Sequence, residues 1–450
     1  MIHSINPYTG EKIYSFTALT TSEVDEKIEF ADQVFKDWKQ TSFTHRAELM
    51  HKTAHILKQN AEKYGRVISE EMGKPITQAI AEVEKCAWVC EYYADNAATF
   101  LASETIETDA QKSFVSYEPL GVILAVMPWN YPFWQVFRFA APTLMAGNAA
   151  VLKHASNVMK SASLIQEIFE EAGFPKGLFQ NLIIGSKAVE NVIRNNKIKA
   201  VTLTGSKPAG SAVASVAAEE IKKAVLELGG NNAFIVLEDA NIDEAVKVGI
   251  NARYQNTGQS CIAAKRLLLH EKIADSFLEK YITEVKALKS GNPLEKDTYI
   301  GVMARESLAE DIEKQVDKSV AMGATVLVGG KREGAYYPPT VISNVTDEMP
   351  VFKEETFGPV IAVKTFKTTE EAIEISNNSE FGLGVSLFTE NTDEALKIAP
   401  RFNEGAVFIN ELVKSDPRLP FGGVKTSGFG RELSSFGIKE FVNIKTVYVK

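Results

Sequence analysis

Cys261 has the residue type and the neighbours that nucleophilic chemistry needs. It is one of only three cysteines in 450 residues, and it follows the run Gly258-Gln-Ser. A glycine three positions before a thiol lets the backbone approach another segment closely. We therefore expect the thiol to lie on a turn from which it reaches a carbonyl carbon. An inert core cysteine is the plainer alternative.

Glu227 is the candidate base that belongs with this nucleophile. It interrupts the apolar end of a predicted strand, just before the break Gly229-Gly230. A nucleophile with a base in reach can split a difficult acyl reaction into two easier steps. A carboxylate that merely caps a helix is the alternative.

Composition indicates a globular protein with a small-molecule partner. The 450 residues suggest two or three domains of about 100–200 residues each, and 45% apolar with 24% charged residues is ordinary for such proteins. The net charge is −9 and no sustained stripe of Lys and Arg is present, which argues against a nucleic-acid surface.

Targeting signals and metal ligands are not expected. The first residues carry no basic and apolar leader, and an odd number of cysteines makes no disulfide framework, so we expect a cytoplasmic protein. The apolar stretch 121–147 is interrupted by three prolines and does not predict a membrane span. Cys86 and Cys90 lie one helical turn apart without further ligands nearby, which favours packing over a metal site.

The first half of the chain predicts helices followed by a parallel sheet. Ser22 with Asp25 resembles a capping box, and further helices are expected over 44–71 and 75–102. Strands then alternate with helices, which predicts a sheet covered on both faces. The expected strands are 113–117, 122–126, 149–152, 182–184, 200–203 and 224–226.

The second half repeats this alternation and predicts a second α/β domain. The expected strands are 233–237, 266–269 and 324–328, and the expected helices are 242–254 and 272–286. With Gly229-Gly230 as the crossover, we expect Cys261 and Glu227 to face each other across a cleft between the domains.

Polar residues follow several predicted strands, where ligands bind in such sheets. The polar loops are 128–130, 153–156 and 204–206. No Gly-x-Gly-x-x-Gly fingerprint follows the first strand. Gly205 and Ser206 are the nearest substitute, because they open a helix whose free N–H groups suit a pyrophosphate. Simple capping of that helix is the alternative reading.

Five motifs occur in order along essentially the whole chain. They are Pro128-Trp-Asn-Tyr-Pro132, Leu226-Glu-Leu-Gly-Gly230, Gly258-Gln-Ser-Cys261, Glu354-Glu-Thr-Phe-Gly-Pro359 and Pro420-Phe-Gly-Gly-Val-Lys-Thr-Ser-Gly428. Together they resemble the motif series of the aldehyde dehydrogenase superfamily, and the closest resemblance is to succinate-semialdehyde dehydrogenases that use NADP or NAD.

The resemblance implies an α/β fold in three parts. Residues 1–100 and 120–229 would form a Rossmann-like cofactor-binding domain, and 230–436 a catalytic domain. Residues 101–119 and 437–450 would form a small β oligomerisation arm that adds a strand to a neighbouring subunit. A homodimer or homotetramer is therefore expected.

The resemblance also implies roles for the reacting groups. Cys261 would attack the aldehyde as a thiolate and form a thiohemiacetal, which becomes a thioester once hydride leaves for the nicotinamide. The Asn130 amide and the Cys261 N–H would hold the oxyanion. Glu227 would activate the water that hydrolyses the thioester.

Cofactor residues are implied in the same way. Trp129 and Lys153 would lie on the adenosine side, Glu355 would hold the nicotinamide ribose, and Phe357 would pack near the ring. Ser156 stands where many NAD-preferring members carry an acid that repels a 2′-phosphate. We therefore expect NADP to be preferred and NAD to be the second cofactor.

Substrate residues are the least determined. Arg138 and Ser415 match carboxylate contacts of succinate-semialdehyde dehydrogenases, and a guanidinium fork suits a carboxylate. Gln255 replaces a second arginine of the longer members, for which Arg418 is a possible substitute. For Arg138, the alternative is a simple pair with an acidic residue. For the protein, the alternative is a broad-specificity aliphatic or other semialdehyde dehydrogenase.

Three other classes fit less well. A papain-like cysteine hydrolase needs a catalytic histidine, and none of the six lies in an obvious catalytic setting. A coenzyme-A-acylating dehydrogenase has no need of a hydrolytic base such as Glu227. A non-catalytic binding protein of this fold has no need of Cys261, Glu227 and Asn130 together.

Overall fold

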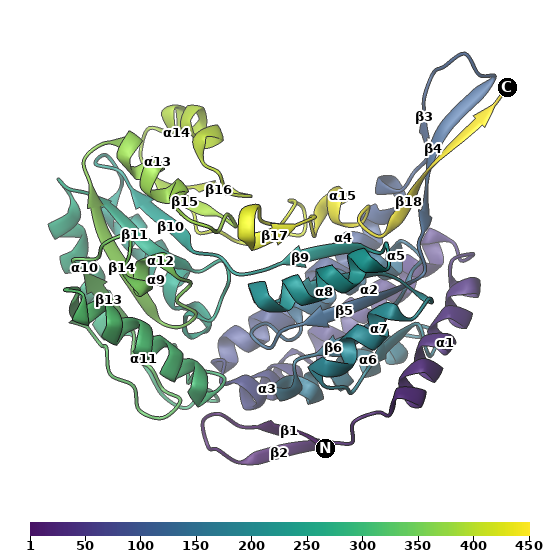
Figure 1. Ribbon diagram of the computed structural model, residues 1–450, viewed down its shortest axis with the longest axis horizontal. Coiled ribbons are helices and arrows are strands. Elements are labelled where there is room, and N and C mark those ends of the chain that lie inside the picture. The colour runs from purple at the N-terminus through teal and green to yellow at the C-terminus, as the bar shows by residue number, and fades with distance from the viewer.

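Two open sheets, one in each half of the chain, form the architecture of the protein (Figure 1). The computed structural model describes residues 1–450. All strand pairs of the first sheet are parallel except that of β17 with β9. In spatial order this sheet contains β17 (Gly428–Phe429), β9 (Lys223–Glu227), β8 (Ile198–Thr204), β5 (Val122–Met127), β6 (Ala149–His154) and β7 (Phe179–Asn181).

Helices cover the first sheet and share one continuous apolar core with it. In α1 the apolar residues Val24, Ile28, Ala31 and Phe35 recur at helical spacing and are all buried, as the sequence predicts. The helices of this part are α1 (Thr21–Trp38), α2 (Phe43–Gln59), α3 (Ala61–Met72), α4 (Ile76–Phe100), α5 (Trp134–Met145), α6 (Met159–Glu171), α7 (Val189–Arg194) and α8 (Lys207–Glu219).

The capping box of α1 lies two residues before the predicted one. Thr20 is the N-cap, its side chain accepts from the Glu23 N–H, and the Glu23 carboxylate accepts from the Thr20 N–H. The expected pair of Ser22 and Asp25 is therefore wrong. Glutamate reaches back to the N-cap N–H, which the shorter side chain of aspartate does less well.

Two other local expectations differ from the structure. The helix expected over 44–71 is divided at Asn60, whose non-helical backbone (φ −114°, ψ 18°) separates α2 from α3. The chain also begins with a hairpin of β1 (Ile2–Ile5) and β2 (Lys12–Phe16), which helical periodicity did not indicate. The strand expected over 182–184 ends instead at Asn181.

The second sheet has seven strands, and its two faces carry separate apolar clusters. Helices α9 (Ile242–Tyr254) and α10 (Ala274–Ala287) cover one face. The other is covered by α11 (Glu306–Ala321), α12 (Pro350–Lys353), α13 (Thr369–Asn377) and α14 (Thr392–Ile398). The strand order is β12 (Thr325–Val328), β13 (Thr340–Ser343), β14 (Val360–Phe366), β11 (Ala264–His270), β10 (Asn232–Val236), β15 (Val385–Phe388) and β16 (Val407–Ile409). The expected α/β architecture is confirmed.

A three-stranded arm projects from the body at the upper right of Figure 1. It consists of β3 (Glu104–Thr105), β4 (Lys112–Pro119) and β18 (Val442–Val449), and β18 pairs with β4 antiparallel along its whole length. The short helix α15 (Ser434–Gly437) precedes β18. Strand β17 belongs to the first sheet, although the sequence placed 428–429 in the second domain.

The link between the two sheets brings their strand ends together. The chain leaves β9 at Glu227 and enters β10 at Asn232 through Gly229 and Gly230. A Cβ atom on Gly230 would lie 2.6 Å from the Cys261 carbonyl oxygen. Only glycine permits this approach, so the crossover holds the Cys261 segment against the first sheet. No helix of the structure is apolar enough over a sufficient length to cross a membrane.

Candidate active site

A cavity of about 340 Å³ lies between the carboxyl ends of β5, β8 and β9 in the first sheet and the amino ends of β11 and β14 in the second. Residues of both halves of the chain line it, and they come from loops after β5, β8 and β9 as well as from the Cys261 turn. Seven of the lining residues are those that the sequence singled out: Trp129, Asn130, Gly205, Ser206, Cys261, Glu355 and Phe357.

The turn before Cys261 has a conformation that brings it against a neighbouring loop. Asn256 and Thr257 have positive φ (55° and 54°), as has Gly258 (71°). A Cβ on Gly258 would lie 2.5 Å from the Gly358 carbonyl oxygen. This is the close backbone approach expected from the glycine three positions before the thiol.

Asn130 is buried beside Cys261 and held on both ends of its side-chain amide. Its Nδ2 donates to the Gln259 carbonyl (3.0 Å), and its Oδ1 accepts from Gln135 Nε2 (3.2 Å). A primary amide has two N–H groups, so one remains for a further acceptor. The amide is thereby oriented before any ligand arrives, as an oxyanion donor must be.

Lys265 is a buried cation next to the nucleophile that the sequence analysis missed. Its Nζ donates to the carbonyls of Ser260 and Cys261 (2.8 Å each) and pairs with Glu355 Oε1 at 3.1 Å. The same Glu355 oxygen accepts from the Gly230 N–H (3.0 Å). The one signal of Lys265 in the sequence is the charged pair Lys265-Arg266 at the start of a strand that continues with three leucines.

The Cys261 thiol is desolvated, which opposes its ionisation. Burial raises the pKa of Cys261 to about 11, while the positive charges of Lys265 and Arg138 act in the opposite direction. The thiolate that attacks a carbonyl therefore depends on cationic neighbours.

Glu227 lies outside the cavity, which Leu228 and Gly229 line instead. It is buried at the end of β9, and neither carboxyl oxygen has a hydrogen-bond partner. Burial and the negative charge of Glu432 raise the pKa of Glu227 well above its usual value, whereas Arg138 and Arg431 act in the opposite direction. In this conformation, therefore, Glu227 and Cys261 do not face each other across one cleft as the sequence predicted.

Lys153 and Ser156 line a second cavity, of about 640 Å³. Trp129 and Arg305 line both cavities, so the two are neighbours. The sequence analysis missed Arg305, which is exposed and makes no ion pair. Nothing in its local sequence distinguishes it from an ordinary surface arginine.

The start of α8 between these cavities has free donors. Ser206 is the N-cap, and its side chain makes no capping hydrogen bond. The first N–H groups of a helix without a cap are available to an anion. This geometry favours phosphate binding over the capping alternative.

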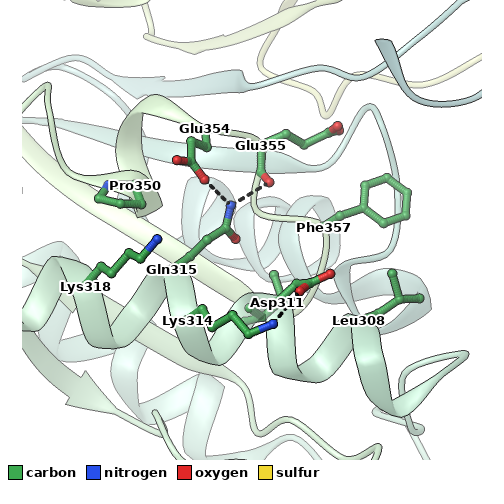
Figure 2. Close-up of a pocket in the computed structure, with 10 residues that line it drawn as sticks. Leu308, Asp311, Lys314, Gln315, Lys318, Pro350, Glu354, Glu355 and Phe357 are labelled. Atoms are coloured by element: carbon green, nitrogen blue, oxygen red, sulfur yellow. Dashed lines mark hydrogen bonds and ion pairs between the residues drawn. The ribbon is translucent and has the colours of Figure 1, made fainter. Parts of the chain in front are cut away.

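A third cavity, of about 380 Å³, adjoins the first through Glu355 and Phe357 (Figure 2). Gln315 Nε2 donates to the Glu354 carboxylate (2.9 Å) and to the Glu355 carbonyl (3.3 Å). The Glu355 side chain points away from Gln315. Gln315 therefore fixes the backbone from which the Glu355 carboxylate reaches Lys265.

Arg138 pairs with Glu432, and both side chains are buried. The guanidinium also lies 4.7 Å from the Phe421 ring centroid, and its Nη2 donates to Thr204 Oγ1 (3.4 Å). This is the acid-paired arrangement left open as an alternative by the sequence. Gln255 is exposed and makes no side-chain hydrogen bond.

Ser415 is buried and contacts a cation that the sequence analysis missed. Lys85 Nζ donates to Ser415 Oγ (3.0 Å) and lies 4.3 Å from the centroid of the Trp134 ring. Lys85 stands one turn after the buried Glu82 and one turn before the buried Val89 on α4. A lysine on the buried face of a helix is the signal from which Lys85 could have been found.

Comparisons with known proteins agree with this geometry. The sequence model of the aldehyde dehydrogenase family matches residues 1–447. A probable NADP⁺-dependent succinate-semialdehyde dehydrogenase of Synechocystis sp. is 50% identical over 100% of this chain and 99% of its own. The NAD(P)⁺-dependent succinate semialdehyde dehydrogenase of Escherichia coli is 46% identical over 99% and 97%. The crystal structure of succinic semialdehyde dehydrogenase from Streptococcus pyogenes with NADP⁺ has a TM-score of 0.97 at 37% identity and 100% coverage of both chains.

Proposed function

The chain belongs to the aldehyde dehydrogenase family, and on that premise we propose that it oxidises succinate semialdehyde to succinate with NADP⁺ as the preferred cofactor and NAD⁺ as the second. It is an NAD(P)-dependent oxidoreductase. The observation that carries the proposal is the single cavity in which Cys261, Asn130 and Glu355 meet. Relatives named for this reaction are 46–50% identical over nearly the whole chain.

Cys261 is the proposed nucleophile. Its thiolate attacks the aldehyde carbon, and the Cys261 N–H and the free amide N–H of Asn130 stabilise the oxyanion of the thiohemiacetal. The nicotinamide, when bound, accepts the hydride from this carbon. What remains on Cys261 is a thioester, which water then hydrolyses.

Glu227 is the proposed base for that hydrolysis. Its raised pKa suits a group that takes a proton from water near neutral pH. Since Leu228 and Gly229 separate it from the cavity in this conformation, its carboxyl has to turn from Glu432 towards Cys261 in order to act.

The residues around the two neighbouring cavities fit a dinucleotide. The uncapped start of α8 at Gly205 and Ser206 suits the pyrophosphate, and Glu355 suits the nicotinamide ribose with Phe357 beside the ring. Trp129 and Lys153, which line the second cavity, suit the adenosine. Ser156 leaves room for a 2′-phosphate, and Lys153 supplies a positive charge for it.

A kinetic comparison tests the proposed function. We expect kcat/KM for succinate semialdehyde to exceed that for hexanal, and kcat/KM for NADP⁺ to exceed that for NAD⁺, when NAD(P)H formation is followed at 340 nm. A preference for hexanal would favour a broad aliphatic dehydrogenase instead. The pairing of Arg138 with Glu432 is the observation that supports that second candidate.

We also propose a homo-oligomer built through the arm, and a cytoplasmic location. The exposed apolar side chains of β18 support the first proposal. Three cysteines without a disulfide suit a reducing compartment, which supports the second.

A further inference from the structure

We propose that Lys85 is the cation that binds the distal carboxylate of the substrate, with Ser415 as its neighbouring hydrogen-bond donor. This inference rests on the proposed function and adds to it the residue that selects an ω-carboxylated aldehyde.

Lys85 packs against Trp134, whose neighbour in the chain, Gln135, lines the cavity that holds Cys261. The Lys85 ammonium contacts Ser415 and the face of Trp134. Trp134 begins α5, one turn before Arg138. Arg138 in turn is near enough to Cys261 and to Lys85 to lower the pKa of both groups. Lys85 therefore belongs to the same charged neighbourhood as the nucleophile.

The other cations of this neighbourhood already have carboxylate partners. Arg138 pairs with the buried Glu432. Arg418 binds Asp416 with two donors, at 2.9 and 2.7 Å. A guanidinium in an ion pair is less available to a substrate carboxylate, because the existing partner must be displaced.

The acids near Lys85 are likewise occupied. Glu82 pairs with Lys74 and accepts from the N–H groups of Phe133 and Trp134 (2.9 and 3.0 Å). Asp416 is held by Arg418. Lys85 consequently forms no ion pair in the protein, and a single hydrogen bond to Ser415 leaves two of its three N–H donors free.

A desolvated ammonium without a partner carries a free-energy penalty that a carboxylate ligand removes. Burial, and then the charge of Arg138, lower the pKa of Lys85 to about 8, whereas Cys86, Asp416 and Glu82 act weakly in the opposite direction. A substrate carboxylate beside Lys85 stabilises its charged form. A neutral aldehyde of similar length gains nothing from this group, so the cation discriminates between the two.

Steady-state kinetics of Lys85→Met with NADP⁺ test the proposal. Loss of a charge-assisted hydrogen bond is expected to raise KM for succinate semialdehyde about 10- to 100-fold. KM for hexanal should change by less than about twofold, and Lys85→Arg should recover most of the loss. Lys58→Met is the matched control, because Lys58 is an exposed lysine of α2 that pairs with Glu91 on α4, the helix that carries Lys85.

The pH dependence of the wild-type enzyme gives a second measurement that does not depend on a folded variant. The ammonium is charged below its pKa, so KM for succinate semialdehyde should rise as the pH increases through about 8. KM for hexanal should not follow. Titration of Cys261 affects both aldehydes and therefore cancels in the ratio of the two KM values.

The outcomes separate this inference from the proposed function. A wild-type enzyme that oxidises hexanal but not succinate semialdehyde would overturn the proposed function. A wild-type enzyme that prefers succinate semialdehyde, with a Lys85→Met variant of unchanged KM, would overturn only the role of Lys85. Equal increases of KM for both aldehydes would indicate that Lys85 merely packs against Trp134, and would also overturn it.

Discussion

The environment of Cys261 sets two opposing influences on its ionisation. Burial disfavours the thiolate. The positive charge of Lys265 stabilises the thiolate, and the Lys265 ammonium also donates a hydrogen bond to the Cys261 carbonyl. Glu355 weakens that stabilisation, because it neutralises part of the lysine charge. The nucleophile therefore depends on an ion pair beside it as well as on its own turn.

Substitution of Lys265 should make the thiol harder to ionise. In Lys265→Met the pKa of Cys261 is expected to rise, so alkylation by iodoacetamide at pH 8 should slow at least about threefold, since removal of a nearby opposite charge shifts a pKa by about one unit or more. The rate should be followed over pH 7–11. Glu355→Gln should change it in the opposite direction, and a slower reaction in both variants would contradict this account.

Substitution of Glu227 should stop the reaction after hydride transfer. Glu227→Gln keeps the shape of the side chain and removes a carboxyl whose charged form burial disfavours, so thermal stability should be retained. Turnover should fall about 10²- to 10⁴-fold, as loss of a general base predicts. Rapid-mixing absorbance at 340 nm should show one burst of NADPH per active site followed by slow turnover.

The pH profile provides the control for Glu227. A base works only when deprotonated, so kcat of the wild-type enzyme should rise with pH through the raised pKa of Glu227. This limb should be missing from the Glu227→Gln profile. A variant that retains the limb would assign it to another group.

At the level of single elements, we propose that the loop after β6 determines which cofactor is preferred. Ser156 lies in the same cavity as Lys153, and neither is paired with an acid. A carboxylate there would repel a 2′-phosphate and accept from ribose hydroxyls. Ser156→Glu should therefore lower the ratio of kcat/KM for NADP⁺ to that for NAD⁺ by about 100-fold, which corresponds to about 2.7 kcal/mol.

A charge placed elsewhere on the same edge is the control for this change. Ser186 is an exposed serine after β7 and lines neither cavity. Ser186→Glu should leave the cofactor ratio unchanged. If it shifts the ratio as far as Ser156→Glu does, the effect is general electrostatics and not a local contact.

For some elements, the periodicity of apolar residues alone predicts the bounds correctly. Helix α9 has the predicted bounds, because buried positions at helical spacing lie between an Asn241 cap and the turn at Gln255. The division at Asn60 and the shift of β7 were not predicted, since both depend on packing against other elements. In such cases tertiary contacts override local propensity.

At the scale of the whole molecule, the arm presents apolar side chains without a partner in the chain. Ile444 is 63% exposed and Tyr448 51%, and they share one face of β18 because they are four residues apart on a strand. The double variant Ile444→Asp, Tyr448→Asp should dissociate the oligomer. Its molar mass in solution, measured by light scattering after size exclusion, should therefore be lower than that of the wild type. Leu396→Asp, at a residue of equal exposure on α14, should not reduce it. An unchanged mass in the double variant would exclude the arm as the interface.

The sequence by itself determined the α/β class, eight of the eighteen strands, and seven of the fourteen residues that line the cavity. These features depend on neighbours in the chain: Gly258 and Cys261 are three residues apart, and alternating apolar runs define strands locally. Motif order then related the chain to its family before any contact was known.

Only the tertiary structure decided the charges of the site. Arg138 meets Glu432 from the far end of the chain, Lys265 meets Glu355 across the second sheet, and Lys85 meets Ser415 without an acid. Pairing and desolvation depend on which groups the packed sheets bring within a few ångströms, and no local pattern encodes that distance. For the same reason the sequence predicted Glu227 as the base, but not that it rests outside the cavity with a raised pKa.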